Sequence, residues 1–352
     1  MPRRSVRLRP APVSGACAAR QPAAGAQVRR AALGRTLLAL CVALLGLAAP
    51  AIAGPAGPAC YPAEALAAKP GEEIVRPRTG GAVSLPDMAT PRMAAVPVGR
   101  RGAIRRVDLP AGEKIVALTF DLCEASAETS GYDGAIVDLL RAEGIDATFF
   151  AGGKWLMSHP ERGDQLTADP RFEMGNHSWS HANLTVRTGE AMRRQVDDAD
   201  VALSLRRKAV EARGCMLPPA PGPALFRFPY GSCSAEALDY VNETGHLAIQ
   251  WDVDSGDPAL IGAKGMAQDM LRVIRPGSIV LMHANGRGKH TAEALRILIP
   301  ALRAKGYRFA TVTDLLAAGR PVIADTCYSM KPGDTRVYDD AARNGRRVLP
   351  AQ

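Results

Sequence analysis

The chain has 352 residues, of which 47% are hydrophobic and 22% charged, a composition typical of a globular protein with a sizeable core. Its formal net charge of +9 is confined to the N-terminus, because residues 1–53 carry eight arginines and no acids, whereas the remainder holds 36 basic and 35 acidic side chains. A nearly neutral body excludes the broad basic surface that a nucleic-acid partner requires, so we expect no such partner.

Residues 1–53 have the pattern of a signal peptide. An arginine-bearing segment ends at Arg35, an apolar run extends from 37 to 49, and Ala51-Ile52-Ala53 supplies a small-x-small cleavage site. The run is shorter than the roughly 20 apolar residues of a membrane span. We therefore expect a periplasmic or secreted protein whose mature chain starts near Gly54. The alternative is an uncleaved signal anchor, which would be its sole association with a membrane.

Three further regions follow. Residues 54–112 are rich in Pro, Gly and Ala and are expected to form an irregular arm or linker. Between 113 and 320, buried strands alternate with helices, which predicts an α/β fold with a parallel sheet, open or closed into a barrel. Residues 321–352 form a polar tail. The expected strands are 115–120, 147–151, 224–228, 247–251, 278–282 and 308–312, and the expected helices are 134–143, 190–211, 235–243, 264–273 and 291–304, with a last turn at 314–318.

Seven cysteines are present, and five would remain after cleavage at Ala53. No CxxC pair exists, which argues against a zinc ribbon or a thioredoxin-like site. Export would permit disulfides. Cys215 with Cys233, and Cys60 with Cys327, are candidate pairs, although the sequence leaves connectivity open. An odd number leaves at least one thiol free.

Polar residues recur where expected strands end. In parallel α/β folds, active groups gather at the carboxyl ends of strands, and four strands of one sheet carry such residues here. These residues are Asp121, Glu124, Arg227, Tyr230, Asp252, Asp254, Asp257 and His283.

His177 and His181 are the strongest local signal. They lie in the segment Gly175-Asn176-His177-Ser178-Trp179-Ser180-His181, directly after another expected strand. If this turn is helical, residues at i and i+4 share one face about 5–6 Å apart. Both imidazoles could then bind one divalent cation, and Asp121 or Glu124 could add a carboxylate. The alternative is a pair of hydrogen-bonded structural histidines.

Five motifs resemble those of carbohydrate esterase family 4, the polysaccharide deacetylases of the NodB-homology type. The resemblance spans about 114–318. The motifs are Thr119-Phe120-Asp121-Leu122-Cys123-Glu124, His177-Ser178-Trp179-Ser180-His181, Arg227-Phe228-Pro229-Tyr230-Gly231, Asp254-Ser255-Gly256-Asp257-Pro258 and Leu281-Met282-His283. The resemblance implies a distorted (β/α) barrel of the NodB-homology type for 113–320, with parallel strands alternating with helices.

The resemblance also implies roles for the site residues. Asp121 would be the general base for a water activated by a divalent metal, with His177 and His181 as ligands. The backbone N–H of Tyr230 would stabilise the oxyanion, and His283 would protonate the departing amine. Arg227 would orient Asp121. Asp254, ahead of Asp257, would orient His283.

Two residues depart from the family pattern. Leu122 replaces an aspartate that is normally a metal ligand, and Pro258 replaces a tryptophan of the substrate groove. Glu124 could replace the lost ligand, Asp121 could serve as both base and ligand, or metal binding could be weak. We assign Glu124 to the metal site on the ground that its longer side chain can reach back from the same loop. The alternative is a solvated loop residue, or one that hydrogen-bonds a backbone amide.

We therefore expect an exported metal-dependent deacetylase that hydrolyses N-acetyl (or O-acetyl) groups on a polysaccharide such as peptidoglycan, a chitin-like oligosaccharide or an exopolysaccharide. Zinc is the expected metal, with cobalt and nickel as alternatives. Tyr230, Trp251 and Trp179 are candidate substrate contacts, although core packing is an equal alternative for the tryptophans. The rival functions are a catalytically weak or dead glycan-binding relative and a metal-assisted hydrolase of small amides. The sequence leaves the oligomeric state open.

Overall fold

The computed structural model describes residues 60–79, 81, 83–93, 95–217 and 223–345. The chain divides into a unit Met1–Pro55 and a compact unit Ala56–Gln352. The predicted signal peptide, with its cleavage site, lies outside the described residues. Among the helices that the structure describes, none is both long enough and apolar enough to cross a membrane.

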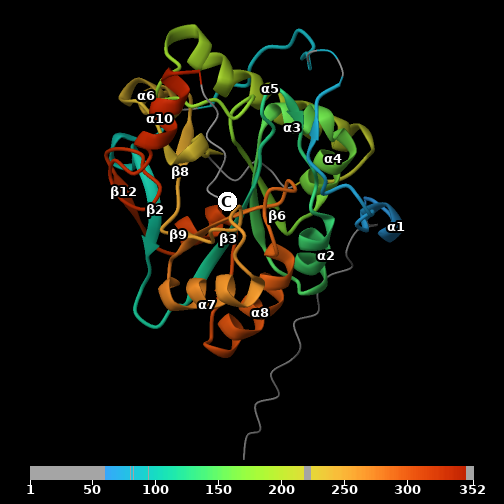
Figure 1. Cartoon of the computed structure of the whole chain (residues 1–352), viewed down its shortest axis with the longest axis vertical. Coiled ribbons are helices and arrows are strands. Elements are labelled where there is room, and N and C mark those ends of the chain that lie inside the picture. Colours follow the sequence, from blue (N-terminus) through green and yellow to red (C-terminus); the bar gives the residue numbers. More distant parts are fainter. Residues whose placement is uncertain (1–59, 80, 82, 94, 218–222, 346–352) are drawn as a thin grey trace, which may run out of the picture. The chain divides into compact units, whose positions relative to one another are not determined.

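One ten-stranded sheet organises the compact unit, with strand order β12-β2-β8-β7-β6-β5-β3-β10-β9 and with β11 paired to β3 (Figure 1). All eight residues of β3 and all five of β5 are buried, as expected for parallel strands covered on both faces. The strands of this sheet are β2 Ala103–Asp108, β3 Ile115–Leu122, β5 Ala147–Ala151, β6 Phe172–Asn176, β7 Ala224–Phe226, β8 His246–Ile249, β9 Val253–Asp254, β10 Ile279–His283, β11 Arg308–Phe309 and β12 Arg320–Ala324.

The sheet curls until two distant strands approach each other. Within the described residues, the strand pairings of this sheet are parallel except the antiparallel one between β12 and β2. Arg106 of β2 also forms an isolated bridge with Ser278, just before β10, and the amide of Val107 donates to the carbonyl of Gly277. This contact partly closes the sheet and confirms the predicted distorted (β/α) barrel.

Helices cover the outer face of the curled sheet (Figure 1). Leu118, Phe120 and Leu122 of β3 pack with α2, α7 and α8 in one large core cluster. Side chains of the opposite strand face, including Ala117, Phe150 and Trp251, form a second cluster. The helices are α1 Ala63–Leu66, α2 Gly134–Ala142, α3 Gly153–Ser158, α4 Pro160–Ala168, α5 Gly189–Ala212, α6 Ala235–Glu243, α7 Ala263–Val273, α8 Thr291–Ala304, α9 Val312–Ala317 and α10 Arg336–Arg343, with 3-10 turns η1 Val98–Arg100 and η2 Pro229–Gly231.

The sheet extends past both predicted limits of the domain. β2 belongs to the predicted arm 54–112, and β12 crosses into the predicted tail 321–352. The arm also contains β1 Arg76–Pro77, which pairs antiparallel with β4 Glu128–Thr129 beside the first motif. The tail continues into α10. Neither terminal segment is therefore a simple linker.

Two disulfides join these terminal segments to the barrel. Cys60 is bonded to Cys215, and Cys233 is bonded to Cys327, with Cα–Cα distances of 5.5 Å and 5.4 Å. The candidate pairs Cys215–Cys233 and Cys60–Cys327 are therefore wrong. The described part of the arm begins beside the end of α5, where Arg213 lies over the ring of Tyr61. The tail is joined by Cys327 to the loop after η2. Cys123 is a buried free thiol.

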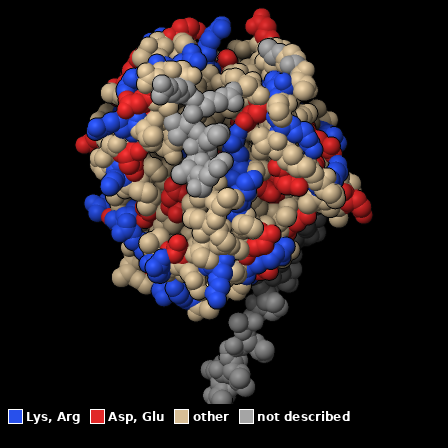
Figure 2. Space-filling view, viewed as in Figure 1, with Lys and Arg blue, Asp and Glu red and all other residues tan. Residues whose placement is uncertain are grey.

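Charged side chains of both signs are intermixed on the face of the molecule seen in Figure 2. Many form exposed ion pairs, such as Arg308 with Glu113 at 2.9 Å and Arg343 with Asp340 at 2.9 Å. Exposed pairs of this kind contribute about 0–1 kcal/mol each. The buried pairs described next are different, because their charges have little access to water.

Candidate active site

Strand register brings the predicted site residues to one edge of the sheet. His283 at the end of β10 is the register partner of Asp121 in β3. On the other side of β3, Asn176 ends β6 as the register partner of Phe226 in β7, so His177 and Arg227 follow at the same level. Parallel strands thus gather four residues that are far apart in sequence.

Asp121 and Arg227 form a buried ion pair. The Asp121 Oδ1 atom lies 2.9 Å from Arg227 Nη1, and their side chains are 5% and 0% exposed. Arg227 also donates to the carbonyls of Ile249 and Gln250, and its guanidinium lies 4.0 Å from the Phe150 ring centroid. Burial lowers the pKa of Arg227, and Asp121 opposes that shift. The predicted orientation of Asp121 by Arg227 matches this geometry.

The histidine segment is a loop rather than the helical turn considered from its spacing. Ser178 and His181 have φ values of 63° and 54°. This left-handed backbone nevertheless brings the imidazole centroids of His177 and His181 to 5.0 Å from each other. Burial lowers the pKa of both histidines, that of His181 well below its usual value. Both rings are therefore neutral near pH 7, which is the form that binds metals.

His177 has an unpartnered nitrogen directed at a carboxylate. Its Nδ1 lies 2.9 Å from the Arg227 carbonyl, an acceptor, so Nδ1 carries the proton. The other nitrogen, Nε2, is buried without a hydrogen bond and lies 3.2 Å from Asp121 Oδ2. Two ligands of a tetrahedral zinc, each about 2.0–2.1 Å from it, lie about 3.4 Å apart. The arrangement therefore fits a divalent cation beside these two acceptors.

A third potential ligand lies next to the histidines. Ligand atoms of Cys123, His177 and His181 are all within 4.8 Å of one another. Burial raises the pKa of the Cys123 thiol to about 12, so this thiol stays neutral unless a cation lies beside it. Sequence reasoning placed Cys123 in a motif but gave it no role. The feature of the sequence that could have pointed to Cys123 is the odd number of cysteines, which leaves one thiol free.

The assignment of Glu124 to the metal site is wrong. Glu124 is completely buried, its Oε1 pairs with Arg78 and accepts from Ser158 Oγ at 2.8 Å, and its Oε2 accepts from the Ser130 amide at 3.2 Å. Burial raises the pKa of this carboxyl. The side chain therefore ties the arm to the motif loop, and the group of adjacent ligand atoms contains Cys123 instead.

Asp257, rather than Asp254, holds His283. Asp257 Oδ1 lies 2.8 Å from His283 Nδ1, and its Oδ2 accepts from the His283 amide at 2.8 Å and from Thr291 Oγ1 at 2.9 Å. Burial opposes protonation of His283, but the charge of Asp257 prevails and the pKa rises to about 9. Asp254 instead accepts from the amide of Gly256 at 2.9 Å. The predicted ranking of the two aspartates is corrected accordingly.

Tyr230 lies in a strained turn beside the histidines. Its φ of 60° is in the left-handed region, which costs a non-glycine residue about 1–2 kcal/mol. Its ring is 4.5 Å from the His181 ring centroid and stacks at 5.3 Å on Tyr338 of α10. Gly231 follows at φ 67°, and a Cβ there would come within 3.0 Å of Trp251. Such strain concentrates at functional sites. Sequence reasoning missed Tyr338.

Trp251 and Trp179 pack mainly in the interior and do not form exposed surfaces on which a sugar ring could stack. Trp251 is 3% exposed and lies between the guanidinium groups of Arg105 and Arg227, at 5.9 Å and 5.5 Å, so its predicted contact with substrate is wrong. Trp179 is partly buried and covers Gly153, where a Cβ would come within 2.3 Å of its ring. The alternative of core packing therefore describes Trp251, and much of Trp179.

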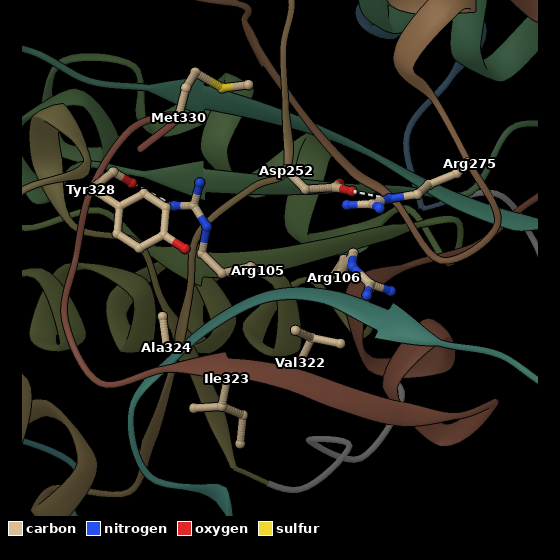
Figure 3. A pocket seen from close by; sticks show the side chains of 9 residues that line it. All are labelled: Arg105, Arg106, Asp252, Arg275, Val322, Ile323, Ala324, Tyr328 and Met330. Carbon is tan, nitrogen blue, oxygen red and sulfur yellow. Dashed lines mark hydrogen bonds and ion pairs between the residues drawn. The ribbon is translucent and has the colours of Figure 1, made fainter. Parts of the chain in front are cut away.

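A separate pocket of about 230 Å³ opens near Asp252 (Figure 3). Arg105 there donates to the carbonyls of Tyr328 and Ser329 and lies 4.0 Å from the Tyr328 ring centroid. Arg275 pairs with Asp252 at 3.2 Å. The lining contains none of the histidines described above. Arg105 holds the tail against the sheet, whereas Arg106 and Arg275 pair with Asp108 and Asp252.

Comparisons with known proteins are consistent with this geometry. Residues 108–249 match the family model described as polysaccharide deacetylase. A chitooligosaccharide deacetylase of Azorhizobium caulinodans is 31% identical over 185 residues, which cover 49% of this chain and 82% of the relative. A peptidoglycan-N-acetylglucosamine deacetylase of Bacillus cereus is 29% identical, with coverages of 59% and 91%.

Solved structures include a carbohydrate esterase family 4 pseudoenzyme from Bacillus anthracis. It is 27% identical to this chain with a TM-score of 0.51, and the match covers 62% of this chain and 70% of that protein. A mutant of that pseudoenzyme is described as having restored enzymatic activity.

Proposed function

Because this chain belongs to the polysaccharide deacetylase family, also called carbohydrate esterase family 4, we propose that it is an exported metal-dependent enzyme that removes acetyl groups from an N-acetylated glycan. The observation that carries the proposal is the presence of two carboxylate-containing pairs, Asp121–Arg227 and His283–Asp257, at one edge of the sheet. Asp121, on β3, is held by Arg227. His283, on the adjacent β10, is held by Asp257. The unpartnered Nε2 of His177 lies beside Asp121.

A bound divalent cation would polarise the acetyl carbonyl and acidify the attacking water. His177 and His181 would hold it, since both are neutral imidazoles with ring centroids 5.0 Å apart. Zinc fits imidazole ligation best, and cobalt and nickel are alternatives. Arg227 acts through its carbonyl as well, because that carbonyl fixes the tautomer of His177.

Asp121 acts as the general base. Its carboxylate takes a proton from water as the water oxygen attacks the acetyl carbon, and Arg227 fixes the carboxylate geometry. The backbone N–H of Tyr230, turned by the left-handed conformation, donates to the oxygen on which negative charge develops.

His283 acts as the general acid. Its Nδ1 donates to Asp257, so Nε2 carries the proton given to the departing nitrogen. The C–N bond breaks with transfer of that proton, and the products are acetate and a free amine. His283 regains its proton from solvent, and Asp121 releases the proton it took. A glycan O-acetyl ester would follow the same steps with an alcohol as leaving group.

The substrate class and location rest on further observations. The two relatives described above are named a chitooligosaccharide deacetylase and a peptidoglycan-N-acetylglucosamine deacetylase, so both names point to a glycan that carries N-acetylated sugars. Two disulfides favour an oxidising compartment. We therefore infer a periplasmic or secreted enzyme that acts on peptidoglycan or a chitin-like oligosaccharide.

The test is acetate release from a panel of N-acetylated and O-acetylated glycans by metal-stripped and metal-restored protein. We expect release from an N-acetylglucosamine glycan, loss on chelation, recovery with zinc or cobalt, and loss in Asp121→Asn. The second candidate, a non-catalytic glycan-binding protein, is favoured by Leu122, which replaces a carboxylate ligand of the family. Glycan binding without acetate release at any metal concentration would establish that candidate and overturn our proposal.

A further inference from the structure

The side chain of Leu122 lies in the core in this chain and takes no part in the site. Successive side chains of a strand point to opposite faces, and Leu122 packs with Leu118 and Phe120 in the core under the helices. Asp121 points to the other face, where it meets Arg227 and His177. Cys123 follows Leu122, so its side chain returns to the same face as Asp121. In this chain the residue that follows Asp121 on the site face is a cysteine.

Cys123 lies within ligand distance of the two histidines. The ligand atoms of Cys123, His177 and His181 are all within 4.8 Å of one another. Zinc bonds of about 2.0–2.1 Å to nitrogen and 2.3 Å to sulfur place such atoms roughly 3.4–3.6 Å apart, so closure onto a cation requires side-chain movements on the order of 1 Å. A second, independent observation is the buried Nε2 of His177, which has no hydrogen-bond partner.

Asn285 holds the sulfur in place. Its Nδ2 donates to the Cys123 carbonyl at 2.7 Å and to Cys123 Sγ at 3.1 Å, and its side chain is fully buried. Outer hydrogen bonds of this kind orient metal ligands and tune their affinity.

From this geometry we propose that Cys123 is the third metal ligand, so that the site is Cys-His-His rather than the carboxylate-containing set of the family. The inference rests on the proposed function for its metal. Three protein ligands leave one position of a tetrahedral cation open for water or substrate, as catalytic sites require. On binding, the thiol proton goes to solvent and the sulfur–metal bond forms as thiolate. A thiolate ligand also favours zinc and cobalt over magnesium or manganese.

Cobalt spectroscopy tests the assignment directly. Cobalt-loaded protein should show a near-ultraviolet sulfur-to-cobalt charge-transfer band, which Asp121→Asn retains and Cys123→Ala lacks. Cys123→Ala should bind zinc about 100-fold or more weakly in competition with a chromophoric chelator, since even outer-shell changes cost 10–100-fold. Cys123→Asp should recover part of that affinity without the band.

Matched controls separate ligation from folding. Ser126→Ala, at an exposed residue of the same loop, should match the parent protein in band and affinity. The metal-free Cys123→Ala and parent proteins should unfold at similar temperatures. Asn285→Ala should keep the band but weaken affinity.

The outcomes distinguish this inference from the proposed function. If cobalt-loaded parent protein lacks the band, or Cys123→Ala binds zinc as tightly as the parent, Cys123 is not a ligand, whatever the acetate assay shows. If the band is present but no glycan is deacetylated, the ligand set stands and the proposed function fails.

Discussion

The charge of His283 depends mainly on one carboxylate, that of Asp257, with smaller contributions from Asp121 and Asp254. Asp257 overcomes the effect of burial and raises the pKa of His283 to about 9, so the imidazole stays protonated, as a general acid must be, through neutral pH. We expect Asp257→Asn to lower that pKa, so that the alkaline limb of the kcat profile moves to lower pH. Maximal kcat should fall about 10²-fold to 10⁴-fold, the range of general acid–base contributions. The measurement is acetate release as a function of pH.

Asp254→Asn is the matched control, because Asp254 binds the amide of Gly256 and contributes less than Asp257 to the charge on His283. Its alkaline limb should stay close to that of the parent enzyme. Equal displacement of the limb in both variants would contradict the assignment of Asp257 as the partner of His283.

At the scale of single residues, the structure brings together the charged residues that the sequence predicts for the site, and their catalytic roles stay predictions. The expected partner of His283 and the assignment of Glu124 are corrected. Asp121, His177, His181, Arg227 and His283 meet because register fixes strand ends, and the motifs mark those ends. The partner of His283 depends on how the chain turns after β9, which spacing alone does not encode. Glu124 was assigned to the metal site by the reach of its side chain, and the alternative of a hydrogen bond to a backbone amide describes it better. Its partner Arg78 lies 46 residues earlier, in a segment without periodicity.

Among the elements, the pairing of β1 with β4 supports the first motif loop from the arm. Arg78 follows β1 and pairs with the buried Glu124. We expect Glu124→Gln to lower the free energy of unfolding by about 1–3 kcal/mol, because a buried polar network loses its charge-assisted bond. Zinc affinity should be unchanged. Urea denaturation and chelator competition measure these two quantities.

Glu64→Gln, at an exposed position of α1 in the same arm, serves as the control and should alter neither quantity. If Glu124→Gln lowered zinc affinity and left stability unchanged, Glu124 would be a metal ligand and our correction would be wrong.

α10 supplies an aromatic wall to the site. Tyr338 is partly exposed and stacks on Tyr230, and Asp339 anchors the helix by accepting from Asn183 Nδ2 and Ser232 Oγ at 2.8 Å and 2.7 Å. We expect Tyr338→Ala to raise KM for glycan oligomers about fivefold to tenfold, roughly 1 kcal/mol of aromatic contact, with little effect on zinc affinity. Steady-state kinetics on oligomers of increasing length measure this.

Tyr338→Phe should behave like the parent enzyme, because the ring makes the stacking contact. Val337→Ala, at an exposed neighbour on the same helix, should also leave KM unchanged. A uniform fall in kcat at constant KM would place the role of Tyr338 in catalysis instead.

Elements with clear periodicity were predicted well. The helices at 235–243 and 291–304 and the strand at 147–151 have the predicted bounds. β2 was missed because its sequence, Ala-Ile-Arg-Arg-Val-Asp, contains two adjacent arginines. Arg105 is nonetheless buried, since it binds backbone carbonyls of the tail and lies over Tyr328. The tail residues that bind Arg105 lie more than 200 residues away in the sequence, so no local pattern reveals that this arginine is buried.

For the molecule as a whole, the two disulfides close long loops, with sequence separations of 155 and 94 residues. Loss of either should lower the free energy of unfolding by about 2–5 kcal/mol. The two losses should be similar, because loop-closure entropy grows only logarithmically with length. Denaturation of the Cys60→Ser/Cys215→Ser and Cys233→Ser/Cys327→Ser proteins measures this.

Function should separate the two disulfides. Cys233 lies in the loop after η2, so its loss loosens the tail that carries Tyr338, whereas Cys60 and Cys215 join the arm to the end of α5. We expect KM to rise only when the Cys233–Cys327 bond is removed. An equal rise in both double variants would show that general destabilisation, rather than the position of the tail, governs substrate affinity.

The bond between Cys233 and Cys327 also sets an order of assembly. During synthesis the base, the acid and both histidines leave the ribosome before Cys327 and Tyr338 do. The barrel can therefore gather its reactive groups while the wall that packs on Tyr230 is still missing. Oxidation of Cys233 and Cys327, which requires an oxidising compartment, then ties this segment to the loop after η2. The position of Tyr338 beside Tyr230 is in this way coupled to the formation of a disulfide.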